Sequence, residues 1–198
     1  MLLLIAVAVI VRVRLRKFQE IPKGFQNVVE MAIESFDGFV RSTAGERLMF
    51  LGDWFFMVFT FILVSNLSGI VGFRPPTADW ATAFAFALAT FAMTHALGVA
   101  RRKGKYLKSF FEPNPIFFPL NVIGELSRPI SLSFRLFGNV LTAMILMSLI
   151  YALIPIYLRF VLPAVLHAYF DLFSGVLQTY IFCTLSLTFI YTASAEAP

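Results

Sequence analysis

The stretch ELSRPISLSFRLFGNVLT, Glu125–Thr142, decides what kind of protein this sequence encodes. It lies within a long apolar run, yet it carries Arg135 with no acidic residue within four positions. A charge at the centre of a bilayer costs about 2.5–3.5 kcal/mol on insertion scales. At ~100° per residue, further polar side chains fall within ~40° of Arg135 on the helical wheel: Arg128, Ser131, Asn139 and Thr142. This polar stripe predicts a helix face that contacts something other than lipid.

The composition indicates a membrane protein. Hydrophobic residues make up 59% of the chain and charged residues 14%, against roughly 45–50% and 25% in soluble domains. The net charge of +5 does not indicate a nucleic-acid partner, because basic clusters beside apolar spans more often follow the positive-inside rule. Of the 16 Lys and Arg residues, 12 lie in Arg12–Arg47 and Arg101–Lys108. That side is therefore predicted to be cytoplasmic, with the C-terminus inside. The single Cys183 is expected to be a buried thiol.

The first forty residues predict two short elements. Residues 1–18 predict a partial first span, because the apolar stretch Met1–Val11 cannot cross ~30 Å of hydrocarbon at ~1.5 Å per residue. Residues 24–41 place apolar side chains at helical intervals and acidic ones on the other side. This pattern predicts an amphipathic helix on the membrane surface or against a partner, and an ordinary surface helix fits it equally well.

Residues 48–73 and 79–100 predict two membrane spans joined as a hairpin, because each is long and apolar enough to cross. Asp79 stands in the N-cap position of the second span. His95 lies near the basic end of the same span, where a histidine with a structural hydrogen bond is expected rather than a proton carrier.

Residues 112–154 and 158–194 each predict a helix too long for an upright crossing. Forty helical residues extend ~60 Å, twice the hydrocarbon thickness. The first must therefore be steeply tilted, kinked near Pro129, or broken, and the second is expected to be tilted as well. The overall prediction is an all-α membrane protein of one domain, residues 1–198. It is a transmembrane helix bundle in which a hairpin of spans accompanies two long, strongly tilted helices.

Each of these two long helices carries a single polar face. On the second, His167, Asp171 and Gln178 lie within ~40° of one another on the wheel. We expect the two faces to meet near mid-membrane and to bring these side chains close to Arg135 and Asn139, with Arg135 exposed. The alternative is that such side chains are only polar contacts between helices. That interpretation fits Asn139, Gln178 and His167 better than it fits Arg135, because a side chain that only packs between helices need not be permanently charged.

Two short motifs resemble one known family. Ser133–Asn139, SFRLFGN, is similar to the signature of subunit a, the stator channel subunit of F-type ATP synthases, and Leu177–Phe182, LQTYIF, is similar to a motif in that family's last helix. The resemblance implies that Arg135 faces the rotating ring of c subunits and attracts its carboxylates without carrying protons itself. It also implies two offset half-channels for H⁺ or Na⁺, 112–154 and 158–194 as the channel helices, peripheral stalk b subunits as partners, and a bacterial plasma membrane as the location.

The resemblance carries over residue by residue with one departure. Many family members place a carboxylate or histidine nine residues after the arginine, but Met144 stands there in this sequence and cannot carry protons. Their titratable partner, seven residues before the glutamine, corresponds to Asp171, which can act with His167 or with water and Asn66. Glu125, ten residues before the arginine, resembles the acid that relatives place near the cytoplasmic half-channel.

Two other classes of protein remain as alternatives. A secondary transporter would bind its substrate at a midplane arginine, but such proteins commonly show inverted repeats, and none is found here. A non-conducting membrane scaffold leaves Arg135 unexplained. The sequence has no phosphate-binding loop and no metal-ligand cluster, so no cofactor or metal is expected. The chain is predicted to be a non-catalytic, ion-translocating subunit.

Overall fold

A computed structural model describes residues 24–112, 114–155 and 161–195, and every regular element within these ranges is a helix. The predicted partial first span, residues 1–18, lies outside them. Within the described ranges, four helical stretches are long and apolar enough to cross a membrane: Glu46–Val71, Trp80–Arg102, Pro115–Leu153 and Leu162–Ser194. The prediction of an all-α membrane bundle is therefore confirmed.

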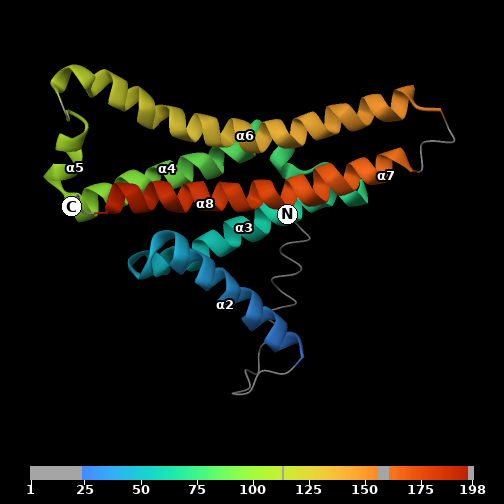
Figure 1. Cartoon of the computed structure of the whole chain (residues 1–198), viewed down its shortest axis with the longest axis horizontal. Helices are drawn as coiled ribbons and strands as arrows, with labels where there is room; N and C mark the ends of the chain where they lie inside the picture. The colour runs from blue at the N-terminus through green and yellow to red at the C-terminus, as the bar shows by residue number, and fades with distance from the viewer. Residues whose placement is uncertain (1–23, 113, 156–160, 196–198) are drawn as a thin grey trace.

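The first described helix, α2 (Phe25–Ala44), is amphipathic and packs on the chain's own bundle. Its buried face includes Phe36 and Val40, and the Phe36 ring contacts the rings of Phe56 and Phe59 at 5.4 Å. The helix ends at Gly45, whose φ of 73° suits a residue without a Cβ and whose N–H donates to the Arg41 carbonyl. In Figure 1, α2 diverges from the remaining helices.

The hairpin predicted from residues 48–73 and 79–100 is built from η1 (Glu46–Leu51), α3 (Gly52–Leu67) and η2 (Ser68–Val71), followed by η3 (Pro76–Ala78) and α4 (Trp80–Arg102). Asp79 occupies the N-cap position of α4, but its side chain makes no capping hydrogen bond. The buried residues of α4 are small, which lets neighbouring backbones approach closely: Ala83, Ala87, Thr90, Thr94 and Gly98. Through this face α4 packs against both long C-terminal helices.

A short helix, α5 (Gly104–Ser109), folds back on the basic end of α4. The turn places Lys103 at φ 49°, a conformation that side chains rarely adopt. It also brings the Tyr106 ring onto α4 at Gly98, where an added Cβ would lie only 2.7 Å from the ring. The close approach of α5 therefore depends on glycine at position 98.

The first long helix, α6 (Phe118–Leu153), follows η4 (Pro115–Phe117) and runs without interruption through Pro129. The expectation left tilting, kinking and breaking open, and the described helix is not broken. The last helical stretch is continuous but not uniform: α7 (Leu162–His167), the π-helical segment η6 (Ala168–Ser174) and α8 (Gly175–Ser194) follow one another directly.

Helices α4, α6 and α8 lie side by side along the long axis of the molecule (Figure 1). Helix α4 packs on α6 and α8, and α3 packs on α8. The core runs between them, and Cys183 is buried in it, as expected. Its most enclosed members are Leu48, Phe55, Val58, Ile62, Leu136, Phe182, Leu187 and Ile190.

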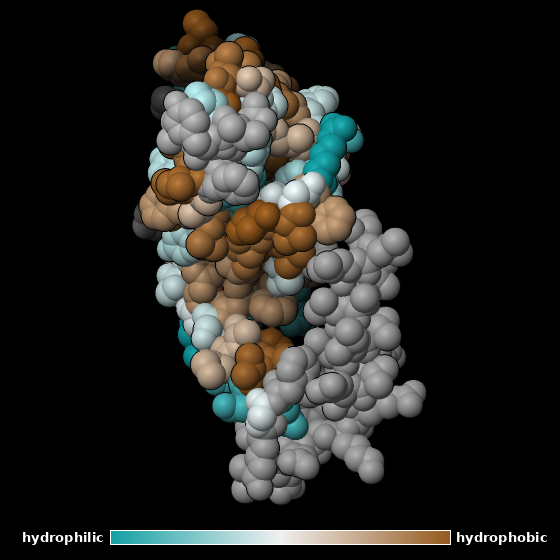
Figure 2. Space-filling model, turned by 90° about the vertical axis from the view of Figure 1, so that its right-hand side faces the viewer, coloured by the Kyte–Doolittle hydropathy of each residue, from teal (hydrophilic) through white to brown (hydrophobic). Residues whose placement is uncertain are grey.

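Figure 2 views one end of the molecule, where apolar side chains cover much of the described surface. Large apolar side chains such as Leu153 and Val165 point outward, which is the arrangement that a lipid environment stabilises.

Candidate ion-translocation site

Arg135 lies on the outer side of α6. Its neighbours Leu132 and Leu136 are buried in the core, whereas Arg135 itself is exposed. Within the described residues, no acidic side chain forms an ion pair with it. The guanidinium is therefore available to a group outside this chain.

The polar faces of α6 and the last helix meet at one hydrogen bond. The Ser174 hydroxyl donates to Oδ1 of Asn139 at 3.0 Å. The two helices run in opposite directions. Arg135 lies four residues before Asn139 on α6, and Gln178 lies four residues after Ser174 on the last helix. This register places Gln178 at the level of Arg135. Gln178 is 7% exposed and its Nε2 has no hydrogen-bond partner in the described structure.

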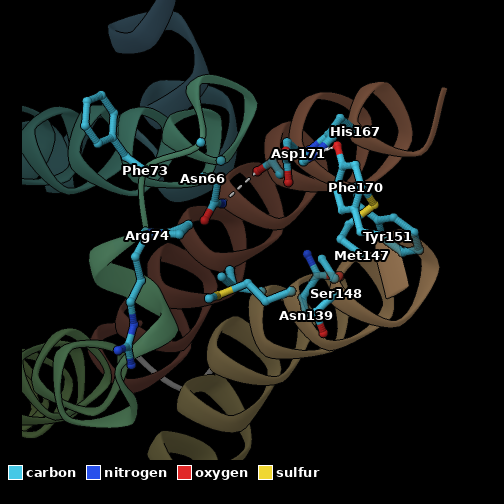
Figure 3. A pocket seen from close by; sticks show the side chains of 17 residues that line it. Asn66, Phe73, Arg74, Asn139, Met147, Ser148, Tyr151, His167, Phe170 and Asp171 are labelled. Carbon is cyan, nitrogen blue, oxygen red and sulfur yellow. Dashed lines mark hydrogen bonds and ion pairs between the residues drawn. The ribbon is translucent and has the colours of Figure 1, made fainter. Parts of the chain in front are cut away.

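A cavity of about 320 Å³ lies next to this level, between the C-terminal half of α6 and the start of the last helical stretch. Figure 3 shows polar side chains from three segments around it: Asn66 from α3, Asn139 from α6, and His167 and Asp171 from the last helical stretch. Nδ1 of His167 lies 2.6 Å from the Asp171 carboxylate. Tyr151 contacts the other ring nitrogen of His167 at 3.5 Å. The cavity thus holds a connected set of titratable groups.

The position occupied by Met144 also lines this cavity. The thioether cannot carry a proton, whereas His167 and Asp171 of the last helical stretch line the same cavity. Asp171 is held close to η2, because an added Cβ at Gly69 would lie 2.9 Å from its carboxylate. Met144 and the His167–Asp171 pair therefore line one cavity.

Asn66 lies in the same cavity, but its amide is already engaged. Its Nδ2 donates to the Gly175 carbonyl at 3.1 Å and to the Thr179 hydroxyl at 3.3 Å, and its Oδ1 accepts from Thr77 at 3.1 Å. Asp171 takes no part in these three bonds. The bonds tie α3 to α8 beside the cavity, so the local contribution of Asn66 is to hold the two helices in place.

Glu125 belongs to a second cavity, of about 340 Å³, at the basic end of the bundle. One of its carboxylate oxygens lies 3.1 Å from the Arg128 guanidinium, and the other is buried with no hydrogen-bond partner in the described structure. Arg128 also lies over the Phe189 ring, 5.0 Å from its centroid. The structure does not bring Glu125 to the cavity of Asp171; Arg135 lies between the two along α6.

Tyr106, which no sequence pattern indicated, also lines the Glu125 cavity. Its hydroxyl lies 2.7 Å from Nδ1 of His95. Burial raises the pKa of Tyr106, and Glu125 raises it further, while Arg128 and Arg102 oppose this. The hydroxyl is therefore kept protonated. Helical periodicity could not link the two residues, because the turn at Lys103 intervenes.

No group of three or more metal-ligating His, Cys, Asp or Glu side chains occurs among the described residues. The two cavities offer carboxylates, imidazoles, amides and hydroxyls. Such groups exchange protons with water and with one another.

Comparison with known proteins gives a consistent result. The family model described as ATP synthase A chain matches residues 1–191. ATP synthase subunit a of Moorella thermoacetica is 37% identical over 178 residues, which cover 88% of this chain and 79% of that protein. ATP synthase subunit a 1 of Syntrophotalea carbinolica is 36% identical, covering 100% of this chain and 83% of that protein. A protein of Propionigenium modestum named "ATP synthase subunit a, sodium ion specific" is 35% identical, covering 83% of this chain and 63% of that protein.

Proposed function

This chain belongs to the ATP synthase A chain family, and from that premise we propose that it is the membrane stator subunit of a rotary F-type ATP synthase. Family membership and four apolar helices make it a multi-pass membrane protein and an ion-translocating subunit of that complex. The proposal adds that it provides two offset half-channels, that Arg135 faces the c-ring, and that it does not itself make or hydrolyse ATP.

The observation that carries the proposal is the position of Arg135 along α6. It is exposed and has no ion pair within the described residues. One polar cavity begins at Asn139, a single turn away, and the other contains Glu125, about 15 Å in the opposite direction. Two separate cavities with a fixed positive charge between them are what a rotary ion path requires.

The chemistry follows from the properties of arginine. Its guanidinium has a pKa above ~12 and keeps its proton in proteins. A ring carboxylate that arrives opposite Arg135 is stabilised in its charged form and releases its ion. The same charge prevents ions from passing directly between the cavities, since a cation near it is repelled. Each unit charge that crosses 100 mV supplies ~2.3 kcal/mol, so several ions are needed for each ATP.

The two cavities then serve as the half-channels. We assign the His167–Asp171 pair, with Asn139 and Gln178 beside it, to the outer path, and Glu125 to the inner path at the basic end. The basic end is placed at the cytoplasm, with the C-terminus inside and a bacterial plasma membrane as the location. The transported ion is H⁺ or Na⁺, and the partners are the c-ring and the peripheral stalk b subunits.

Substitution of Arg135 tests this function. In complexes reconstituted into vesicles, Arg135→Ala is expected to abolish ATP synthesis driven by an ion gradient while leaving the complex assembled, because only the fixed charge is lost. Arg135→Lys is expected to fail as well or to work poorly, since lysine can release its proton. Arg41→Ala, at an exposed surface ion pair with Glu46, is the matched control and should keep wild-type activity.

Two results would contradict the proposal. The first is gradient-driven synthesis that survives in Arg135→Ala. The second is a purified chain that comes down without c-type and soluble ATPase subunits, which would favour a self-contained secondary transporter. Family membership already favours the stator over that alternative.

A further inference from the structure

The inner cavity contains a titratable hydroxyl that the proposed function leaves unused. Tyr106 of α5 and Glu125 of α6 both line this cavity. The Tyr106 hydroxyl lies 2.7 Å from Nδ1 of His95 on α4, within hydrogen-bond distance. His95 is thereby connected to the cavity through one hydroxyl, although it does not line the cavity itself.

The local backbone is shaped to make this contact. Gly98 leaves room for the Tyr106 ring, because a Cβ there would lie 2.7 Å from it. Lys103 takes a positive φ of 49° at the turn that folds α5 back, a conformation that costs of order 1–3 kcal/mol and persists only where the surroundings impose it.

Two buried polar atoms near the cavity lack partners. Nε2 of His95 and one carboxylate oxygen of Glu125 are both buried without a hydrogen bond in the described structure. The imidazole is otherwise enclosed by aromatic rings, with Phe91 at 4.1 Å and Phe110 at 6.3 Å between centroids. Packing within the described residues therefore leaves both polar atoms unpaired.

We propose that His95, reached through the Tyr106 hydroxyl, is a proton-loading group of the inner half-channel, working beside Glu125. A hydronium ion in the cavity gives a proton to the Tyr106 oxygen while Tyr106 passes its own proton to Nδ1 of His95, leaving a water molecule, a neutral tyrosine and an imidazolium. Release runs through the same bonds in reverse, so atoms and charge balance at each step. This inference rests on the proposed function, since it assumes that protons pass through the Glu125 cavity.

Both signs of charge lie around the pair. Glu125 and Arg128 of α6 line the cavity beside Tyr106, and Arg102 of α4 lines it from the basic end. The cavity beside the relay therefore contains a carboxylate as well as guanidinium groups. Such balance suits a group that must gain and lose a proton in every cycle.

The test measures ATP-driven proton pumping in vesicles that contain the reconstituted complex. Tyr106→Phe removes only the relay hydroxyl. His95→Asn keeps an acceptor oxygen near the position of Nδ1, so the hydrogen bond is retained and only the proton-carrying ring is lost. Each variant is expected to lower the pumping rate by roughly tenfold to a hundredfold, and the double variant should be no slower than the worse single one. Tyr191→Phe, an exposed tyrosine at the same end and outside the cavity, should pump normally.

A pH profile separates a proton carrier from a structural histidine. The wild-type pumping rate should show an inflection with pH, and His95→Asn should lose that inflection while the complex still assembles. Wild-type rates and an unchanged profile in both His95→Asn and Tyr106→Phe would overturn the relay. Arg135→Ala is measured in parallel: if it still pumps, the proposed function fails, and if it does not, a normal His95→Asn overturns the relay alone.

Discussion

Packing alone does not explain why a glutamine is buried at position 178. It is buried, and its Nε2 has no hydrogen-bond partner in the described structure, although an unpaired buried polar group costs about 1–3 kcal/mol. The helix register places it at the level of Arg135. We interpret the amide as one that is kept for a group outside this chain, such as a ring carboxylate or its water.

Gln178→Leu is therefore expected to separate stability from function. The apolar side chain removes an unpaired group, so thermal stability should be unchanged or higher, while gradient-driven ATP synthesis should fall by roughly tenfold. Thr179→Val, one residue along, is the control: it removes a hydroxyl bonded to the Gly175 carbonyl at 2.8 Å and to Asn66, so it should lose about 1 kcal/mol of stability. Equal stability losses in both variants would contradict this interpretation.

Asp171→Asn tests the outer cavity. The amide keeps the size of the side chain and one acceptor toward His167 but cannot carry a proton, so ion translocation should slow by roughly tenfold without dissociation of the complex. Asp53→Asn, the same change at an exposed position at the start of α3, should have no effect. Transport rates that match the wild type from pH 6 to 9 would assign Asp171 to packing instead.

At the scale of elements, the π-helical segment Ala168–Ser174 holds the outer titratable group. Such segments are rare and occur mostly at functional sites. Here the segment places Asp171 against Gly69 of η2, at the turn of the hairpin.

Gly69→Ala is expected to displace the Asp171 side chain, although the two residues lie far apart in the sequence. The new Cβ would lie 2.9 Å from the carboxylate, so the flexible carboxylate end must move away from His167, at little cost in stability. Translocation should slow as in Asp171→Asn, and the double variant should be no slower than either one. Gly38→Ala, which meets no heavy atom within 4 Å, is the control. A fully active Gly69→Ala would show that the His167–Asp171 contact is dispensable.

The sequence predicted the helices well and their irregularities poorly. Apolar length alone identified the four spans, because a bilayer requires about twenty residues of hydrocarbon-facing helix. Proline at position 129 suggested a kink or break as much as a tilt, yet helices in membranes tolerate proline where neighbouring groups satisfy the freed backbone. The π-helical segment left no trace in the periodicity, because it shifts the register by only a fraction of a turn.

Candidate site residues could be proposed from the sequence where a polar or charged side chain lies in an apolar run. A permanent charge singled out Arg135, which is exposed, and a shared helix face singled out His167 and Asp171, which are in contact. The pair of His95 and Tyr106 was not predictable, because it forms across a turn and depends on a small residue at Gly98. Sequence patterns within one helix carry no information about such a contact.

For the whole molecule, the lengths of the helices conflict with the thickness of a bilayer. The stretch Pro115–Leu153 has 39 residues and Leu162–Ser194 has 33, or ~58 and ~50 Å against ~30 Å of hydrocarbon. Exposed apolar side chains occur near both ends of the first, with Ile116 76% and Leu153 80% exposed. If that helix stood upright, one end or both would carry such side chains into water.

We therefore expect α6 and α8 to lie far from the membrane normal, beyond the ~20° average of membrane helices. Full immersion of the longer stretch would need a tilt of roughly 60°. A tilted pair would also keep Arg135 and Gln178 near mid-membrane while several turns of α6 follow a curved ring. A cryo-electron microscopy map of the complex in lipid nanodiscs measures both angles and the side on which Arg135 lies. Two helices within 20° of the normal, or an Arg135 facing lipid away from the ring, would contradict the stator arrangement.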